Sequence, residues 1–159
     1  MARRRAREVA FRALFQSERG SSPLLEVWQG VRAEALSDDE DYGQDYGQDY
    51  GQAYGDRLDS EGLDFAERLV TTFGAHRSEI DDRLERSLEG WTFSQMAQTD
   101  LTVLRLALTE FLYFDDIPNE VTIEIAVRIA KKFGGEESGR FVNGVLARFY
   151  RAMQAPVRG

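Results

Sequence analysis

The feature that most limits the fold of this chain is one stretch whose apolar side chains recur at helical spacing on nearly every side. It runs from Ser94 to about Tyr113, and Ser94 is its predicted N-terminal cap. A helix that is apolar all around is stable only when other elements surround it. We therefore expect this helix to lie, buried, at the centre of the fold. Its apolar members are Leu101, Val103, Leu104, Leu106, Ala107, Leu108, Phe111 and Leu112.

Most of the remaining sequence has a helical period as well, and no run alternates apolar and polar residues with the period of a strand. The predicted fold class is all-α, with about seven helices, in a single domain of residues 1–159. Glycine, proline and polar capping residues mark the breaks between the helices. Besides the central helix, the predicted helices span residues 3–18, 23–35, 64–73, 78–88, 120–133 and 136–153.

An acidic tetrapeptide repeat interrupts this helical pattern. It begins with Asp41-Tyr42-Gly43-Gln44 and decays by residue 56. A glycine in every repeat costs a helix about 1 kcal/mol each, and the neighbouring like charges repel one another. We predict a disordered low-complexity insertion loop at residues 38–60. Ten acidic residues and one basic residue between positions 38 and 64 give this segment a net charge of −9, so the formal charge of −8 leaves +1 for the rest.

The residue types that catalysis and metal binding need are scarce. The absence of cysteine excludes disulfides, thiolate metal sites and cysteine nucleophiles. The single histidine, His76, ends a predicted helix, where it is expected to act as a cap. Pairs of carboxylates at 81–82, 115–116 and 136–137 fall in loops or at helix starts, where capping and solvation explain them. We predict a protein that is not an enzyme and that uses no metal or cofactor.

Targeting signals are also missing from the sequence. No run reaches 18 continuous apolar residues, and no apolar region of signal-peptide length follows the N-terminal arginines. We expect neither a membrane span nor a signal peptide. The lack of cysteine fits a reducing compartment, so the expected location is the cytoplasm.

The first predicted helix carries a cluster of four arginines, Arg3, Arg4, Arg5 and Arg7. On a helical wheel Phe11 and Phe15 lie with Arg4 on the face opposite the apolar stripe. Outward-facing guanidinium groups that pair with phosphates, beside rings that stack on unpaired bases, would form an RNA-binding platform. Two alternatives stay open at this point: the rings contact a second layer of helices while the arginines are solvated, or the helix lies on a membrane surface.

A second segment of interest, residues 131–146, joins the last two predicted helices. The pair Gly134-Gly135 allows a tight turn, and Gly144 inside the following helix suggests that another helix backbone passes close by. Asn143 can hydrogen-bond a neighbouring backbone or a base edge. The alternative interpretation is an ordinary helix–helix junction with capping residues.

Several segments together resemble motifs of the NusB family of bacterial transcription antitermination factors. They are ARRRARE at residues 2–8 with the apolar stretch that ends at Phe15, LRLALTE at 104–110, the loop and helix from Ile117 to Ala126 before AKKFG at 130–134, and FVNGVL at 141–146. The resemblance covers the chain from end to end except the tyrosine repeat. Phe15 departs from the pattern, because many relatives carry tyrosine there.

The resemblance implies an all-helical fold of two packed bundles. It also implies that the chain binds single-stranded boxA RNA with ribosomal protein NusE, within an RNA polymerase antitermination complex that supports rRNA transcription. The positions that match the RNA-facing residues of the family are Arg3, Arg4, Arg5, Arg7, Phe15, Glu137, Arg140, Phe141 and Asn143.

Other interpretations remain beside this one. The chain could be the helical RNA-binding domain of an rRNA-modifying system, or a protein-binding helical module without RNA affinity. The acidic insertion could compete with RNA for the arginines. The sequence leaves open whether the protein is a monomer or a homodimer, and no motif marks the residues that bind NusE.

Overall fold

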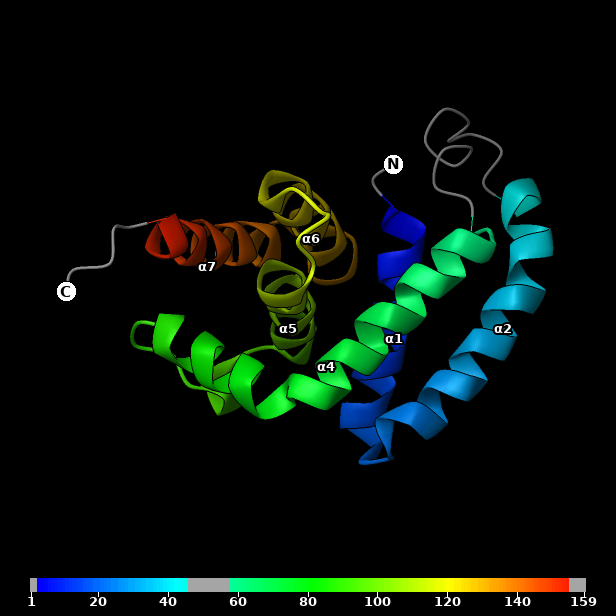
Figure 1. Ribbon diagram of the computed structural model, residues 1–159, viewed down its shortest axis with the longest axis horizontal. Coiled ribbons are helices and arrows are strands. Elements are labelled where there is room, and N and C mark those ends of the chain that lie inside the picture. The colour runs from blue at the N-terminus through cyan, green and yellow to red at the C-terminus, as the bar shows by residue number, and fades with distance from the viewer. Residues whose placement is uncertain (1–2, 46–57, 155–159) are drawn as a thin grey trace. The chain divides into compact units, whose positions relative to one another are not determined.

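The computed structural model describes residues 3–45 and 58–154, the side chains of residues 37–45 excepted. Within these ranges the secondary structure is helical, without strands, which confirms the predicted all-α class (Figure 1). The elements are α1 (Arg4–Gly20), α2 (Leu24–Asp45), α4 (Ser60–Ser87), the 3₁₀ helix η1 (Phe93–Gln95), α5 (Gln98–Tyr113), α6 (Asn119–Gly134) and α7 (Glu136–Gln154).

The chain divides into two compact units, Met1–Ala75 and His76–Gly159, and each is described by itself. The first contains α1, α2 and the beginning of α4, and the second contains the rest of α4 with η1, α5, α6 and α7. The single domain over residues 1–159 stays a prediction. In the insertion predicted at 38–60, the helix α2 continues through Asp45 and α4 begins at Ser60. The repeat copies from residue 46 to 57 lie outside the described residues.

The first unit is held together by apolar side chains at helical spacing. In α1 the buried stripe contains Val9, Ala10, Ala13 and Leu14. The α1 helix ends where Ser21 adopts a left-handed conformation with φ 52°, and the Ser22 N–H donates to the Ser17 carbonyl at 3.1 Å. This hydrogen-bonded cap turns the chain into α2, as the predicted break at residues 20–23 required. Figure 1 shows α1 and α2 connected through this turn.

The span α4 covers the two helices predicted at 64–73 and 78–88. The chain kinks between them at His76, where φ is −123° and ψ is 21°, so two helical segments meet there. The first segment begins earlier than predicted, at Ser60, and runs past Gly74, because one glycine costs a helix only about 1 kcal/mol. His76 lies at the break between the segments. Its ring stacks on Tyr113 with the centroids 4.1 Å apart.

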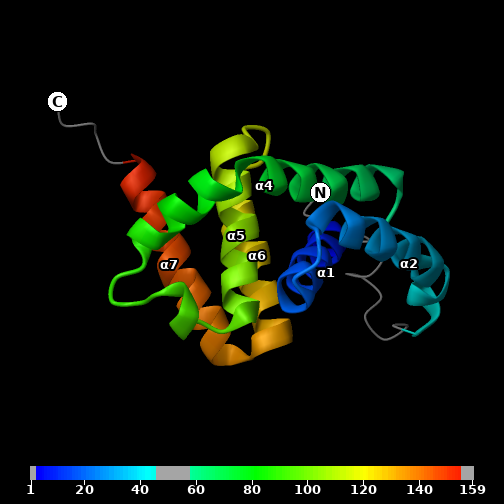
Figure 2. The ribbon, with the colours of Figure 1, turned by 90° about the horizontal axis from the view of Figure 1, so that it is seen from below.

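The second unit is built on α5, against which α6 and α7 pack while also packing on one another (Figure 2). Every residue of α5 from Leu101 to Phe111 is buried, which confirms the predicted central helix. Its start differs from the prediction. Ser94 lies in η1, and α5 begins after Ala97, which caps it without a side-chain hydrogen bond.

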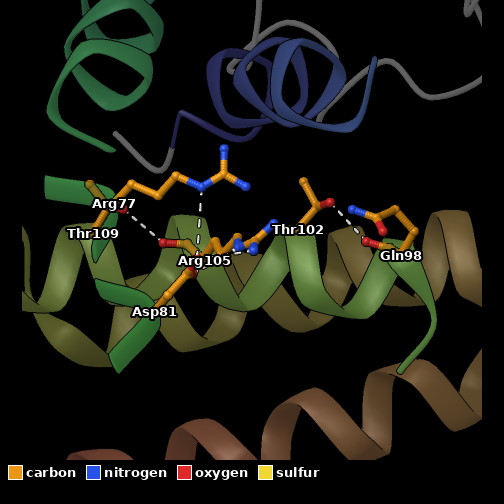
Figure 3. Close-up of polar contacts among 6 residues, drawn as sticks. All are labelled: Arg77, Asp81, Gln98, Thr102, Arg105 and Thr109. Carbon is orange, nitrogen blue, oxygen red and sulfur yellow. Dashed lines mark hydrogen bonds and ion pairs between the residues drawn. The ribbon is translucent and has the colours of Figure 1, made fainter. Parts of the chain in front are cut away.

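Four polar side chains are buried in α5 and each has a hydrogen-bonding partner. Thr102 and Thr109 donate to the carbonyls of Gln98 and Arg105 one turn earlier, at 2.8 and 2.7 Å (Figure 3). Glu110 accepts a hydrogen bond of 2.9 Å from the Thr122 hydroxyl of α6. The polar groups of this helix are thus compatible with its burial.

The fourth polar group, Arg105, forms a two-pronged ion pair with Asp81 of α4 (Figure 3). Its Nε lies 2.9 Å from Oδ1 and its Nη2 lies 3.1 Å from Oδ2. Arg77 approaches the same carboxylate, with Nε 3.8 Å from Oδ2, and the Arg105 guanidinium carbon lies 5.5 Å from the centroid of the Phe93 ring. This one arginine therefore connects α4, α5 and η1.

A second polar link joins α6 to α7. The Tyr150 hydroxyl donates to Glu120 Oε1 at 2.7 Å. This hydrogen bond lowers the pKa of Glu120 and raises the pKa of Tyr150, because it favours the ionised carboxylate and the protonated phenol. Both groups lie at the surface of the second unit.

The turn between α6 and α7 has the predicted tight geometry. Gly135 has φ 89°, a conformation that side chains disfavour. A Cβ on Gly139 would lie 2.5 Å from Lys131 Cγ, so α6 and α7 approach closely there. The close approach predicted at Gly144 is wrong, because a Cβ built there meets no atom within 4 Å.

We predict that Arg105→Ala lowers the free energy of unfolding by about 3–5 kcal/mol, because it leaves Asp81 without its main partner in a partly buried site. Urea titration followed by circular dichroism measures this change. The double variant Arg105→Met with Asp81→Leu is the control, and it should recover a large part of the loss. Equal destabilisation by the single and double variants would contradict the assigned ion pair.

Candidate nucleic-acid interface

The N-terminal arginines lie at the first turn of α1. Arg3 adopts a left-handed conformation with φ 56°, and its carbonyl accepts the Arg7 N–H at 3.1 Å. Its Nη2 lies 3.5 Å from Glu61 Oε2. Arg4 Nε lies 3.6 Å from Glu8 Oε2, one turn along the same helix. Both side chains are partly exposed and make long ion pairs, although the Nε of Arg4 is itself buried.

The expectation that all four arginines face outward is wrong for two of them. Arg5 is 7% exposed and Arg7 is 4% exposed. The guanidinium carbon of Arg7 lies 5.0 Å from the centroid of the buried Phe65 ring, and that of Arg3 lies 5.3 Å from it. Two cations therefore share one aromatic ring inside the first unit.

Helical spacing explains this burial. Arg5 precedes Val9 by four residues, and Arg7 precedes Ala10 and Leu14 by three and seven residues, so both arginines continue the buried faces of α1. The apolar stripe of α1 is rich in small alanine side chains. Long arginine stems cover apolar surface that alanine leaves open. The sequence thus contained a signal for the burial of these two arginines.

The two rings of α1 have different roles. Phe11 is buried, so the prediction that it faces away from the core is wrong and the alternative of a packed ring applies to it. Phe15 is half-buried and stacks on Phe11, with the centroids 5.6 Å apart. The guanidinium carbon of Arg19 lies 5.6 Å from the centroid of the Phe15 ring. Phe15 thus remains partly accessible and has a cationic neighbour that sequence reasoning did not single out.

The second group of predicted residues lies on the first turns of α7, in the other unit. Glu137, Arg140 and Asn143 are exposed, and Phe141 is half-buried. The Phe141 ring meets Trp91 edge to face, with the centroids 5.4 Å apart and the planes at 65°. Sequence reasoning missed Trp91, although a large aromatic residue directly after Gly90 in a loop was a signal for it.

Metal chemistry finds no support in the described part of the chain. Residues 3–45 and 58–154 contain no group of three histidine, aspartate or glutamate side chains placed to hold a metal ion, as far as their side chains are described. No described helix is long and apolar enough to cross a membrane.

Taken together, the fold and this site define an all-helical protein that presents arginine and aromatic side chains at its surface. Comparison with known proteins identifies its family. The model of the NusB family matches residues 4–151, and the chain belongs to this family.

The relatives of known name agree with this assignment. The chain is 48% identical to transcription antitermination protein NusB of Thermus thermophilus over 96% of its length and 93% of the relative. It is 45% identical to NusB of Deinococcus deserti, with coverage of 96% and 83%. Proteins of this family are transcription factors rather than enzymes, which confirms the prediction of a non-enzymatic protein.

Solved structures agree on the fold. The chain superposes on T. maritima NusB with a TM-score of 0.73 and 35% identity, over 94% of this chain and 90% of the other. A structure of antitermination factors NusB and NusE in complex with double-stranded RNA has a TM-score of 0.74 at 24% identity, with coverage of 95% and 97%. At that identity the second likeness supports the fold alone.

We predict that Arg7→Ala lowers the free energy of unfolding by about 1–2 kcal/mol, because it removes the cation from Phe65 together with a buried stem. Arg12→Ala is the matched control on α1. Arg12 pairs with exposed Glu34, and such surface pairs contribute less than about 1 kcal/mol. Urea unfolding measures both variants, and equal midpoints for Arg7→Ala and the wild type would contradict the structural role of Arg7.

Proposed function

We propose that this chain is a transcription antitermination factor that binds single-stranded boxA RNA together with ribosomal protein NusE. In this role it acts in the cytoplasm within an RNA polymerase antitermination complex and supports rRNA transcription. The observation that carries the proposal is the match to the NusB family along nearly the whole chain, including the arginine-rich first turn of α1. The choice of boxA RNA and NusE as partners follows from what membership of the NusB family implies.

In the first unit, the proposed RNA contacts are Arg3, Arg4 and Phe15, whose side chains are partly accessible. Arginine pairs with phosphate through two hydrogen bonds. Glu61 is exposed and its ion pair with Arg3 is long, so little is lost when a phosphate replaces it. Glu8 is buried, so a phosphate at Arg4 has to bind beside this carboxylate rather than replace it. Arg5 and Arg7 contribute positive potential and hold the start of α1 in place.

In the second unit, the proposed contacts are Glu137, Arg140, Phe141 and Asn143 on α7. Arg140 provides a charge for phosphate, and Phe141 provides a ring for a base. Asn143 has an amide that can both donate to and accept from a base edge. Glu137 can accept a hydrogen bond from a base amino group.

We expect Arg4→Ala to weaken RNA binding and to reduce the slope of log K against log salt by about 0.7, the value for one fewer phosphate neutralised on a single strand. Arg128→Ala is the matched control, because Arg128 also pairs with a carboxylate one turn away, at 3.1 Å from Glu124. Filter binding at two salt concentrations measures both variants. An Arg4→Ala slope equal to that of the wild type would exclude Arg4 from the interface.

Specificity is tested with boxA-like and scrambled single strands, each with and without NusE. The antitermination factor should prefer the boxA-like strand and bind it more tightly when NusE is present. Equal binding of both strands would indicate a general polyanion binder. Binding of neither strand, alone or with NusE, would indicate a protein-binding module and defeat the proposal.

A third expectation concerns Phe15. Phe15→Ala should weaken RNA binding by about 1–3 kcal/mol, because it removes one base-stacking surface, whereas Phe15→Tyr should retain the affinity. The same filter-binding titration gives both values. Equal affinities of the alanine and tyrosine variants would show that the ring does not stack on a base.

A further inference from the structure

The loop before η1 places an aromatic side chain at the surface of the second unit. Trp91 follows Gly90, whose φ of 78° turns the chain, and its side chain is 47% exposed. It contacts Phe141 of α7 edge to face. An edge-to-face pair leaves ring surface that the partner does not cover. Because Trp91 is 47% exposed, a base can stack on the part of its ring that solvent reaches.

Packing against the described residues does not explain why the residue one turn beyond Phe141 is a glycine, Gly144. Gly144 is exposed, and a Cβ built on it meets no atom within 4 Å. Gly139 on the same helix is different, because a Cβ there would collide with Lys131. Glycine inside a helix is less stable than alanine, so internal packing explains Gly139 and leaves Gly144 unexplained. Gly30 is an equally open helical glycine, so the open space alone does not indicate a ligand. Gly144 differs in lying one turn from Arg140 and Phe141, where a ligand bound to these side chains would approach the backbone of α7.

Charge and spacing on this face of α7 favour a nucleic acid. Arg140 and Arg148 are exposed and lie one turn before and one turn after Gly144, so they are two turns, or about 11 Å, apart along the helix. Apart from the small Ala147, the residues that share this face carry no aliphatic side chain: Glu137, Arg140, Phe141, Gly144, Arg148 and Arg151. A protein-binding groove is richer in apolar side chains at its centre, whereas cations beside rings are typical of single-strand binding.

We propose that Trp91 and Phe141 form a platform for one unpaired base of single-stranded RNA. The bare backbone at Gly144 admits the strand between Arg140 and Arg148, whose guanidinium groups bind its phosphates. This inference rests on the proposed RNA-binding function and deepens it. It adds Trp91, Gly144 and Arg148 to the contacts of the second unit.

The two tryptophans allow a direct spectroscopic test. Trp28 is 1% exposed and donates to Glu67 at 2.9 Å, whereas Trp91 is open to solvent. Titration with a boxA-like single strand should quench the tryptophan fluorescence, and Trp91→Phe should abolish the quench. Trp91→Ala should weaken binding at least about fivefold, the loss of one base stack. A quench that persists in Trp91→Phe, or an unchanged affinity of Trp91→Ala, would overturn the platform.

The proposed approach of the RNA strand to the backbone at Gly144 is tested by introducing a side chain at this position. Gly144→Gln introduces a good helix former, so it should keep or raise the Tm while it weakens binding of the same RNA strand several-fold. Gly30→Gln is the matched control, because Gly30 is also an exposed helical glycine with no atom within 4 Å of a built Cβ. It should keep or raise the Tm and leave the RNA affinity unchanged.

The outcomes separate this inference from the function on which it rests. If the wild type binds the strand and Gly144→Gln binds it equally well, the inference is wrong and the proposed function stands. If Gly144→Gln keeps the RNA affinity and loses the binding of NusE, this face of α7 is a protein interface and the inference is also overturned. A wild type that binds no RNA, with or without NusE, overturns both.

Discussion

The burial of α5 on all sides is the constraint on which the second unit depends. A polar group buried in a helix is costly unless it is hydrogen-bonded, and the buried part of α5 contains two threonines, a glutamate and an arginine. The threonines hydrogen-bond within the helix, so they need no hydrogen-bond partner from the neighbouring helices. Glu110 and Arg105 require partners from α6 and α4, and this requirement fixes how these helices pack around α5.

The arginines of α1 contribute to the packing of the first unit. Arg7 packs on Phe65 with almost no exposed surface, and Arg3 contacts the same ring from a partly exposed position. A cluster of like charges at the end of a helix is unfavourable unless each charge has a partner. The Phe65 ring meets part of this need, and the carboxylates of Glu61 and Glu8 lie near Arg3 and Arg4 as well.

The sequence was sufficient to predict the elements whose periodicity is strong. The central helix and the tight turn at Gly134-Gly135 were predicted correctly, because apolar spacing and glycine act locally. The break between the helices predicted at 64–73 and 78–88 is present as a kink, but it lies at His76 rather than at Gly74, because a single glycine costs a helix little. The exposure of each arginine depends on tertiary contacts: Phe65 is far from Arg7 in the sequence.

The candidate site was only partly predictable for the same reason. Phe141 was singled out from the sequence, but its neighbour Trp91 comes from a loop far earlier in the chain, and only the fold brings the rings together. The surroundings of Gly144 were not predictable for a related reason. A glycine in a helix indicates that something approaches closely, and the sequence does not say whether it belongs to the chain itself.

For Gly139 the approaching group is Lys131, which belongs to the fold. For Gly144 the space is open, so the cost of the glycine is not offset by packing among the described residues. Features that lower the stability of a protein without an internal compensation are expected where function requires them. The same reasoning applies to Trp91, whose large ring is left half in solvent. Trp91 contacts Phe141 and Gly144 lies one turn beyond it on α7, and this proximity is the reason to treat this part of α7 as a candidate binding surface.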